Sequence, residues 1–405
     1  MKRRQLIKNL SLLPVAGAAG SLLATETKAA APPGSKRNLF KELGIRTFIN
    51  AAGTYTFMTG SLMREEVVEA IQSTSHEFCL LDDVQDKVGA KIAELTKAES
   101  AVVTAGCFSA MTLGLAGVLT GNDADKAAKL PHLAGTGMKS EVIMQKGHNV
   151  GYAQALTNTG CTIVSVETID DVEKAINDKT AMLWFLNIQS DKGVITHEQW
   201  VALGKKHSIP TMIDIAADVP PISNLWKFNE MGFDLVCISG GKAIRGPQSA
   251  GILMGKKNLI AAARLSMAPR GATIGRGMKI NKEEIIGMYA ALEHYLNYDH
   301  DKEWKEWEAR VVTINDAIKN ISGVTTEVKV PTLGNVTPTL HVTWDKNKLK
   351  LATKDLQEGL RNGNPSIEIV NNGDEHISIT TWVMKAGEEK IVARRLKEEL
   401  MKGAG

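Results

Sequence analysis

Between Ala101 and Gly255 the chain alternates short apolar runs with segments of helical spacing, and this alternation limits the possible folds more than any other feature. The runs AVVTAG, VIMQ, CTIVSV, AMLWFLN, TMIDIAA, FDLVCISGG and GILMG are nearly continuous in apolar residues. Strands that helices cover on both faces have this composition, whereas half-exposed strands alternate apolar with polar residues. The pattern therefore predicts an α/β fold with a mainly parallel sheet between layers of helices.

The length of 405 residues exceeds what one hydrophobic core usually serves, which predicts a large and a smaller domain. A long helical segment begins after Asn281, a good N-cap, and is expected to run out of the large domain. Short alternating runs and a charged last helix follow and indicate a small α+β domain. The predicted divisions are a signal peptide at 1–31, a linker and arm at 32–60, a large cofactor domain at 61–290, and a connecting helix with a small domain at 291–405.

The first 31 residues have the order of an export signal. A basic start with the pair Arg3 and Arg4 precedes an apolar stretch, Leu10 to Leu23, and small residues follow at 29–31. The sequence RRQLIK resembles the twin-arginine export motif, whose machinery transports folded proteins. The stretch is short and rich in Gly and Ala, so no stable membrane span is expected. We expect a periplasmic or otherwise exported protein; an anchor that stays uncleaved and a frayed basic terminus are the alternatives.

Composition argues against two classes of function. Residues 1–31 carry five basic side chains and one acidic, so the whole-chain charge of +3 leaves about −1 for the remainder. A nearly neutral body lacks the basic excess of a nucleic-acid binder. The four cysteines have no CxxC spacing and the nine histidines no HExxH spacing, so we expect free thiols and no metal site.

Two side chains at the ends of apolar runs carry the strongest chemical signal. Asp214 ends the run TMID, and Lys242 follows VCISGG. Ligands of open α/β sheets bind at the carboxyl ends of the strands, so both side chains are expected in one site. A lysine amine with a carboxylate suits pyridoxal phosphate, because the amine holds the aldehyde as an imine and the carboxylate keeps the pyridine nitrogen protonated.

Neighbouring residues fit the same ligand. Gly240 and Gly241 would let the backbone approach the ring, and Ser239 offers a hydroxyl to the phosphate. Gly106 and Cys107 begin a helix directly after a strand, where unpaired amides bind phosphate. Taken singly, each feature has an ordinary explanation as a solvated lysine, a capping aspartate or a glycine turn.

The run SGGKAIRGPQSAG resembles the cofactor-lysine motif of the family that contains bacterial selenocysteine synthase and D-glucosaminate-6-phosphate ammonia-lyase. The resemblance extends from about Leu39 to the C-terminus and includes IDIAADVPP and IGRGMKINKEEIIGM. It implies the type I fold of pyridoxal-phosphate enzymes, that of aspartate aminotransferase, with pyridoxal phosphate as the cofactor.

By position, the resemblance implies that Lys242 is the Schiff-base lysine and Asp214 the partner of the pyridinium. Gly106, Cys107 and Ser239 would hold the phosphate. His148, within QKGHN, would stack on the cofactor ring or be an ordinary loop histidine.

The remaining roles concern the substrate and a second subunit. Guanidinium and ammonium groups bind substrate anions, although each candidate has an alternative role as a surface cation. These candidates are Arg245, Arg270, Arg276 and Lys279. The family's active site lies at a dimer interface, to which Asn50, Thr54 and Tyr55 would contribute, so a homodimer or larger homo-oligomer is expected.

Several reactions at Cα remain open to such a site. The resemblance favours an α,β-eliminating lyase of the ammonia-lyase type, acting on an amino acid or amino-sugar acid. A racemase, an aminotransferase and a non-catalytic binding protein are the alternatives; the presence of both Asp214 and Lys242 argues against the last. Selenium transfer to tRNA is disfavoured because a signal segment stands in place of the tRNA-binding domain, so that name would apply by similarity only.

Overall fold

The computed structural model describes residues 37–374 and 376–403, so the predicted signal segment lies outside the described residues. The chain divides into two units, Met1–Thr47 and Phe48–Gly405. The described part of the first unit holds one short helix, α1 (Leu39–Glu42), whose Lys41 N–H donates to the side chain of Asn38. All features described below belong to the second unit.

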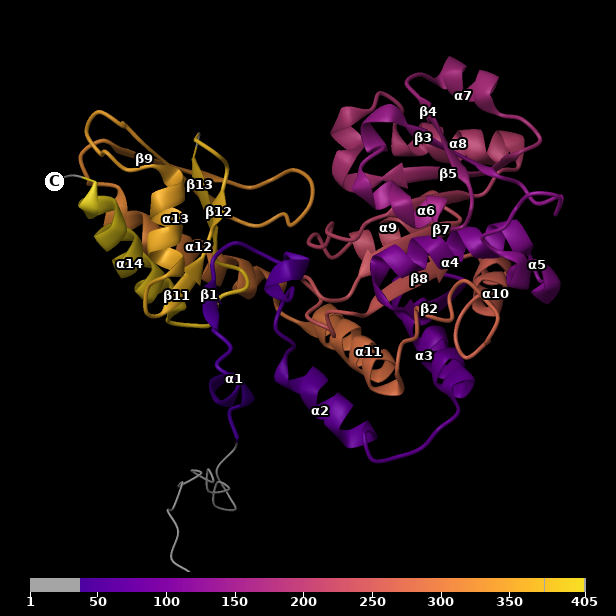
Figure 1. Cartoon of the computed structure of the whole chain (residues 1–405), viewed down its shortest axis with the longest axis horizontal. Coiled ribbons are helices and arrows are strands. Elements are labelled where there is room, and N and C mark those ends of the chain that lie inside the picture. Colours follow the sequence, from indigo (N-terminus) through magenta and orange to yellow (C-terminus); the bar gives the residue numbers. More distant parts are fainter. Residues whose placement is uncertain (1–36, 375, 404–405) are drawn as a thin grey trace, which may run out of the picture. The chain divides into compact units, whose positions relative to one another are not determined.

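A seven-stranded sheet forms the centre of the large domain (Figure 1). Its strand order is β2-β8-β7-β6-β5-β3-β4. Neighbouring strands are parallel from β7 to β4, whereas β8 runs antiparallel to both β2 and β7. The mainly parallel sheet predicted from the sequence is therefore confirmed. The strands are β2 (Ser100–Thr104), β3 (Glu141–Gln145), β4 (Thr162–Val166), β5 (Thr180–Leu186), β6 (Thr211–Asp214), β7 (Leu235–Ser239) and β8 (Gly251–Gly255).

Both faces of this sheet are buried, as the continuous apolar runs require. In β5, Leu183 and Phe185 belong to one hydrophobic cluster, while Met182, Trp184 and Leu186 belong to another. Successive residues of a strand point to opposite faces, so the two clusters lie on opposite sides of the sheet. The helices of the large domain are α2 (Glu65–Thr74), α3 (Leu81–Thr96), α4 (Gly106–Thr120), α5 (Ala124–Lys129), α6 (Gln154–Thr157), α7 (Ile169–Ala175), α8 (His197–His207), α9 (Asn224–Met231), α10 (Lys257–Leu265) and α11 (Lys282–Asn297).

The helical segment predicted after Asn281 is two helices rather than one. Asn281 caps α11 through a capping box with Glu284, as its position suggested. The chain leaves helical geometry at Tyr298, and the Asp299 side chain then caps α12 (His300–Ile318). An acceptor side chain that satisfies the first amides of a new helix favours a break at that point.

The small domain is built on an antiparallel sheet with the order β12-β13-β10-β9. A separate parallel pair joins β1, near the start of the described chain, to β11. Helices α12 and α14 pack together beside these strands, and the shared core includes Ile314, Leu340 and Leu396. The elements are β1 (Phe48–Asn50), β9 (Val324–Lys329), β10 (Thr339–Trp344), α13 (Thr353–Arg361), β11 (Ser366–Glu368), β12 (Val370–Asn371), β13 (Ile377–Thr380) and α14 (Glu388–Lys402).

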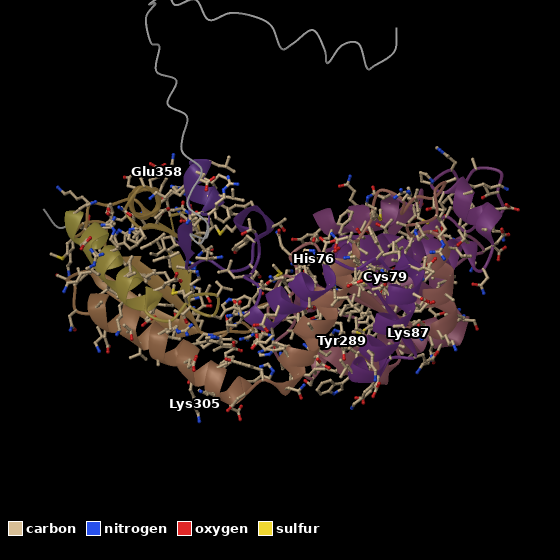
Figure 2. All side chains as sticks on the ribbon, turned by 90° about the horizontal axis from the view of Figure 1, so that it is seen from below. His76, Cys79, Lys87, Tyr289, Lys305 and Glu358 are labelled. Atoms are coloured by element: carbon tan, nitrogen blue, oxygen red, sulfur yellow. The ribbon has the colours of Figure 1, made fainter. Side chains whose placement is uncertain are left out.

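Short 3-10 helices lie in three of the connections: η1 (Thr56–Met58) after β1, η2 (Lys146–His148) and η3 (Gly151–Ala153) between β3 and α6, and η4 (Asn187–Lys192) after β5. The four cysteines are free thiols, and Cys79 is exposed in the connection between α2 and α3 (Figure 2). Among the described residues, none of the helices is long and apolar enough to span a membrane.

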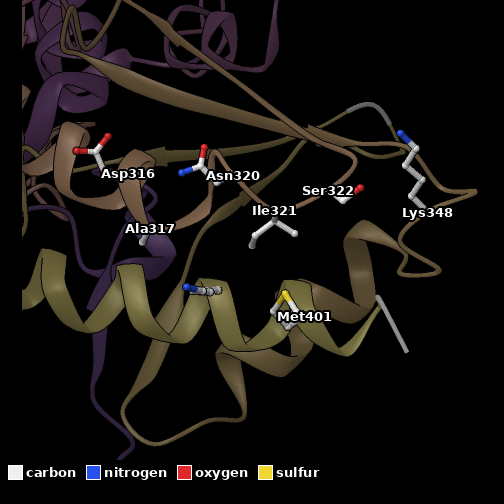
Figure 3. A pocket seen from close by; sticks show the side chains of 8 residues that line it. Asp316, Ala317, Asn320, Ile321, Ser322, Lys348 and Met401 are labelled. Atoms are coloured by element: carbon white, nitrogen blue, oxygen red, sulfur yellow. The ribbon is translucent and has the colours of Figure 1, made fainter.

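A hollow of about 610 Å³ lies beside α12 and α14, where Asp316, Lys348 and Met401 line it (Figure 3).

Candidate active site

A cavity of about 540 Å³ lies at the carboxyl ends of the central parallel strands. Leu186, Asp214 and Ser239, the last residues of β5, β6 and β7, all line it. The first residues of α4 and the side chain of Lys242 also border it. Five residues that were expected together from the sequence therefore line one cavity: Gly106, Cys107, Asp214, Ser239 and Lys242.

Asp214 is a nearly fully buried carboxyl, with 3% of its surface exposed. Its Oδ1 accepts hydrogen bonds from the Ala216 N–H at 2.8 Å and from Cys107 Sγ at 3.3 Å. Burial raises the pKa of Asp214, while those two donors and the charge of Lys242 oppose the rise. A cation bound beside this carboxyl would stabilise its ionised form.

The N-terminus of α4 borders the cavity without a side-chain cap. Gly106 begins the helix with a φ of +86°, a conformation that favours glycine, and Ala105 at the N-cap has no side-chain acceptor. On the adjacent strand, a Cβ added to Gly251 would lie 2.5 Å from the carbonyl carbon of Gly106, so glycine permits this close approach. Uncapped amides at the start of a 15-residue helix form a suitable site for an anion.

Lys242 lies on the turn that follows β7. Its side chain lines the cavity, and no hydrogen bond or ion pair engages its Nζ among the described residues. The two glycines before it are required by their protein surroundings. A Cβ on Gly241 would lie 2.5 Å from the Cα of Gln248, and one on Gly240 would collide with Met288 Sδ, so both glycines make room for protein atoms.

Asp218 is a cavity residue that the sequence argument did not single out. It is 3% exposed and lines the same cavity, four residues after Asp214 in IDIAADVPP. Its Oδ1 accepts a hydrogen bond from the Gly334 N–H at 3.1 Å. Its Oδ2 is buried without a hydrogen bond of good geometry, although the Asn187 side chain lies close enough to favour the ionised carboxyl and oppose the rise of its pKa. Burial raises the pKa of Asp218 to about 6. The sequence does show a second carboxylate shortly after β6, which could have suggested a site residue. The direction of its side chain follows only from the fold.

The structure does not bring His148 into the cavity. This histidine is fully buried, its Nδ1 accepts from the Leu186 N–H at 3.2 Å, and its ring meets Phe185 edge-on with centroids 4.5 Å apart. Burial lowers the pKa of His148 to about 4. The ring is held against Phe185 and Leu186 of β5, and Tyr152 is the aromatic side chain in the cavity lining; stacking of His148 on the cofactor stays a prediction.

None of the four predicted substrate-binding cations lines the cavity either. The Arg245 guanidinium instead donates a hydrogen bond from Nη2 to the Trp382 carbonyl oxygen at 2.6 Å. Burial lowers the pKa of this arginine. Arg270 is paired with Asp82 at 2.7 Å. Arg276 and Lys279 are exposed, away from the cavity lining. Their roles toward a substrate remain predictions.

The three residues predicted near a subunit interface differ in their surroundings. Asn50 Oδ1 accepts from the N–H groups of Ala52 and Gly53 and so shapes the turn after β1. Thr54 is buried, and its hydroxyl has no partner among the described residues. Tyr55 is 45% exposed and precedes Thr56, which lines the cavity.

The arrangement fits pyridoxal phosphate on three counts. A buried carboxyl without an ion pair in the described structure would meet a protonated ring nitrogen, an available amine would meet the aldehyde, and an uncapped helix start would meet the phosphate. The three groups come from different strand ends around one cavity large enough for a small-molecule ligand.

Residues 48–322 match the SelA family, described as L-seryl-tRNA selenium transferase. The chain belongs to this family. A D-glucosaminate-6-phosphate ammonia lyase of Salmonella typhimurium is 28% identical over 375 residues, which cover 89% of this chain and 97% of that protein. A structure of D-glucosaminate-6-phosphate ammonia-lyase superposes with a TM-score of 0.80 and 27% identity, covering 92% of this chain and all of that one.

The wider fold is shared with enzymes that bind the predicted cofactor. A structure of SPT with pyridoxal phosphate, only 14% identical, superposes with a TM-score of 0.55 over 87% of each chain. The family and the fold together make this chain a pyridoxal-phosphate enzyme of the lyase or transferase class, with the type I fold. The fold, the cofactor and the enzyme class predicted from the sequence are confirmed.

Proposed function

We propose that this chain is an exported lyase that eliminates across Cα and Cβ of a 2-amino-3-hydroxy acid and releases ammonia. The observation that carries this proposal is the joint placement of Lys242, Asp214 and Asp218 around one cavity. The similarity to an ammonia lyase over most of both chains supports the reaction type. The net change converts the amino acid to a 2-oxo-3-deoxy acid and ammonium, so no oxidant or reductant is needed.

The cofactor, when bound, supplies an electron sink for the pair released at Cα. Asp214 would hold the positive charge at the ring nitrogen, and Cys107 would keep that carboxylate oriented through its hydrogen bond. The amides at the start of α4 and the Ser239 hydroxyl would bind the phosphate. Lys242 Nζ would hold the aldehyde carbon, and the same amine would be the base that takes the proton from Cα of the substrate.

Asp218 is the group best placed to protonate the leaving hydroxyl at Cβ. Its side chain lines the cavity, and burial raises its pKa despite the opposing Asn187 side chain, so a proton stays available at higher pH than usual. We expect Asp218→Asn to lower kcat by about 100-fold, the usual contribution of one general acid, with a smaller change in KM. Equal loss of kcat and of cofactor affinity would instead indicate a purely structural role.

The central experiment compares the visible spectrum of the purified protein with that of Lys242→Ala. A visible band in the parent that borohydride removes, and that the variant lacks, would support the covalent role of Lys242. Ammonia release from a 2-amino-3-hydroxy acid would then support elimination. Cα epimerisation without ammonia would favour a racemase, and transfer of the amine to an added 2-oxo acid would favour an aminotransferase. A parent that stays colourless with added cofactor would leave the binding-protein alternative.

Export is proposed from the order of basic, apolar and small residues at 1–31. A fusion of these residues to a folded reporter tests it. We expect the reporter outside the cytoplasm, and we expect Arg3→Lys with Arg4→Lys to keep it inside. Retention of a full-length product in the membrane fraction would show that the segment acts as an anchor.

A homodimer or larger homo-oligomer is proposed from the exposed apolar side chains near the cavity. Phe57 is 78% exposed directly after Thr56, and Tyr152 is 60% exposed while it lines the cavity. Phe78 and Leu80 are also strongly exposed. Large apolar side chains left exposed in this way are buried when subunits associate. Light scattering at the monomer mass would contradict the proposal, and Phe57→Asp is the variant expected to weaken association.

A further inference from the structure

A second, smaller cavity of about 230 Å³ lies next to the candidate active site. The turn after β1, the loop at 331–337 and the ends of β10, β12 and β13 surround it. Binding sites for whole small molecules usually measure about 300–1,000 Å³. A cavity below that range suits one part of a ligand whose remainder lies elsewhere.

The two cavities share a wall. Gly334 lines the smaller cavity, and its N–H donates to Asp218 Oδ1 of the larger one. The next residue, Asn335, donates its N–H to the Ala217 carbonyl oxygen at 2.6 Å. On another side, the consecutive residues Tyr55 and Thr56 line one cavity each. A ligand with its amine at Lys242 therefore has the smaller cavity as its neighbour.

The lining of the smaller cavity is polar but carries no charge. None of its 13 residues is acidic, basic or a histidine. Trp382 and Tyr55 contribute aromatic rings, which pack well against the C–H faces of a carbon chain. Six further residues contribute hydroxyl or amide side chains: Asn335, Thr337, Thr339, Asn372, Ser378 and Thr380.

Two of these polar side chains lack partners within the described structure. Thr380 is 6% exposed, and its Oγ1 makes no hydrogen bond; the buried Asn335 Oδ1 makes none either. In contrast, Thr337 Oγ1 donates to the Asn335 carbonyl oxygen, and Thr339 Oγ1 donates to that of Thr337. A buried polar atom without a partner destabilises the folded protein unless a ligand or water satisfies it.

We infer that this cavity binds an uncharged, hydroxyl-bearing tail of the substrate whose amine reacts at Lys242. A ligand hydroxyl both donates and accepts, so it can donate to Asn335 Oδ1 and pair with Thr380 Oγ1. A phosphate at this position would meet no cationic side chain in the lining, and the neighbouring Arg245 guanidinium is already engaged by the Trp382 carbonyl oxygen. The inference rests on the proposed function and narrows its substrate to 2-amino-3-hydroxy acids with a neutral polyhydroxylated tail.

The experiment uses three substrates that share the amine, carboxylate and 3-hydroxyl groups and differ in the tail. They are the three-carbon acid, a six-carbon acid with a free polyhydroxylated tail, and the same six-carbon acid with a terminal phosphate. We expect the neutral six-carbon acid to have the highest kcat/KM. Thr380→Val, which keeps the side-chain shape, should lower that value about five- to tenfold, as expected for one lost hydrogen bond, and leave the three-carbon acid unchanged.

Two control variants keep the result interpretable. Thr343→Val makes the same replacement at an exposed position of β10 outside the cavity lining. It should leave kcat/KM unchanged for both the three-carbon and the six-carbon acid. Thr380→Ser retains the hydroxyl and should restore most of the lost kcat/KM. Equal effects of Thr380→Val on the three-carbon and six-carbon acids, or a preference for the phosphorylated acid, would overturn the inference while the lyase function stands.

A binding measurement separates this inference from the proposed reaction. If none of the three acids releases ammonia, the lyase function fails, and calorimetry with the six-carbon aldonate that lacks the amine decides the role of the cavity. If the parent binds the aldonate and Thr380→Val binds it about fivefold more weakly, the inference is supported. The absence of binding, or equal binding to both proteins, would overturn it.

Discussion

Cys107 Sγ lies 3.3 Å from Asp214 Oδ1, so one hydrogen bond joins the start of α4 to the end of β6. Both residues are buried at the cavity wall. The contact connects the group expected to hold the phosphate with the carboxyl expected to hold the ring nitrogen. The cysteine therefore has a positional role that its thiol chemistry alone does not suggest.

Replacement of Cys107 should weaken cofactor binding without abolishing it. In Cys107→Ala, Asp214 loses a donor that opposes the rise of its pKa, so its ionised form becomes less favourable. We expect the affinity for pyridoxal phosphate to fall about fivefold, the effect of one modest hydrogen bond. Absorbance titration of the apoprotein measures it. Cys107→Ser retains a donor and should bind within about twofold of the parent; equal losses in both variants would contradict the argument.

Asp218 should make stability depend on pH in a defined direction. Folding raises the pKa of Asp218 from 3.8 to about 6, so the folded state disfavours its ionised form. The free energy of unfolding of the parent should fall relative to that of Asp218→Asn as the pH rises from about 4 to about 6, by about 3 kcal/mol in total. Above about pH 6 the difference between the two proteins should change little. Urea unfolding of both apoproteins at pH 4, 5, 6 and 7.5 measures this difference. A difference that is constant over this range would show that the carboxyl titrates as it does in water.

Gly334→Ala should destabilise the protein more than an ordinary left-handed glycine replacement. Gly334 has a φ of +61°, and an added Cβ would lie 2.5 Å from Ile188 Cδ1. Gly373 is the matched control, because its φ is +68° and an added Cβ meets nothing within 4 Å. We expect Gly373→Ala to cost about 1–2 kcal/mol and Gly334→Ala about 1–3 kcal/mol more. Equal losses of unfolding free energy in the two variants would mean that the Ile188 side chain moves aside without an energetic penalty.

The pair Arg64 and Glu303 should be sensitive to removal of one partner. Their side chains are 12% and 7% exposed and 2.8 Å apart, and the Arg64 guanidinium also stacks 4.1 Å from the Tyr298 ring centroid. Arg64→Met leaves the buried Glu303 without this partner and should lower the free energy of unfolding by about 3–5 kcal/mol. Adding Glu303→Leu to this variant should restore part of the loss. In the exposed pair of Lys91 and Glu94, Lys91→Met should stay within about 0.5 kcal/mol. Thermal or urea unfolding of the parent and these three variants checks the comparison.

The sequence predicted those parts of the site that follow from strand order. Asp214, Ser239 and Lys242 could be placed together because each follows an apolar run and parallel strands end at a common edge. Arg245 and Arg270 could not be placed, because the Trp382 carbonyl and Asp82 that engage them lie 137 and 188 residues away in the chain. Asp218 and the smaller cavity depend on the loop at 331–337, whose approach to β6 has no local sequence signal.

The antiparallel strand β8 has a consequence for the reactive lysine. The chain leaves β7 at Ser239 and enters β8 at Gly251, and these two residues are paired in the sheet. Lys242 is therefore carried on a closed loop whose ends are fastened by main-chain hydrogen bonds. The conformational entropy of closing that loop is lost when the sheet forms, before any ligand arrives. The amine is thus preorganised by folding, and cofactor capture need not order the segment that bears it.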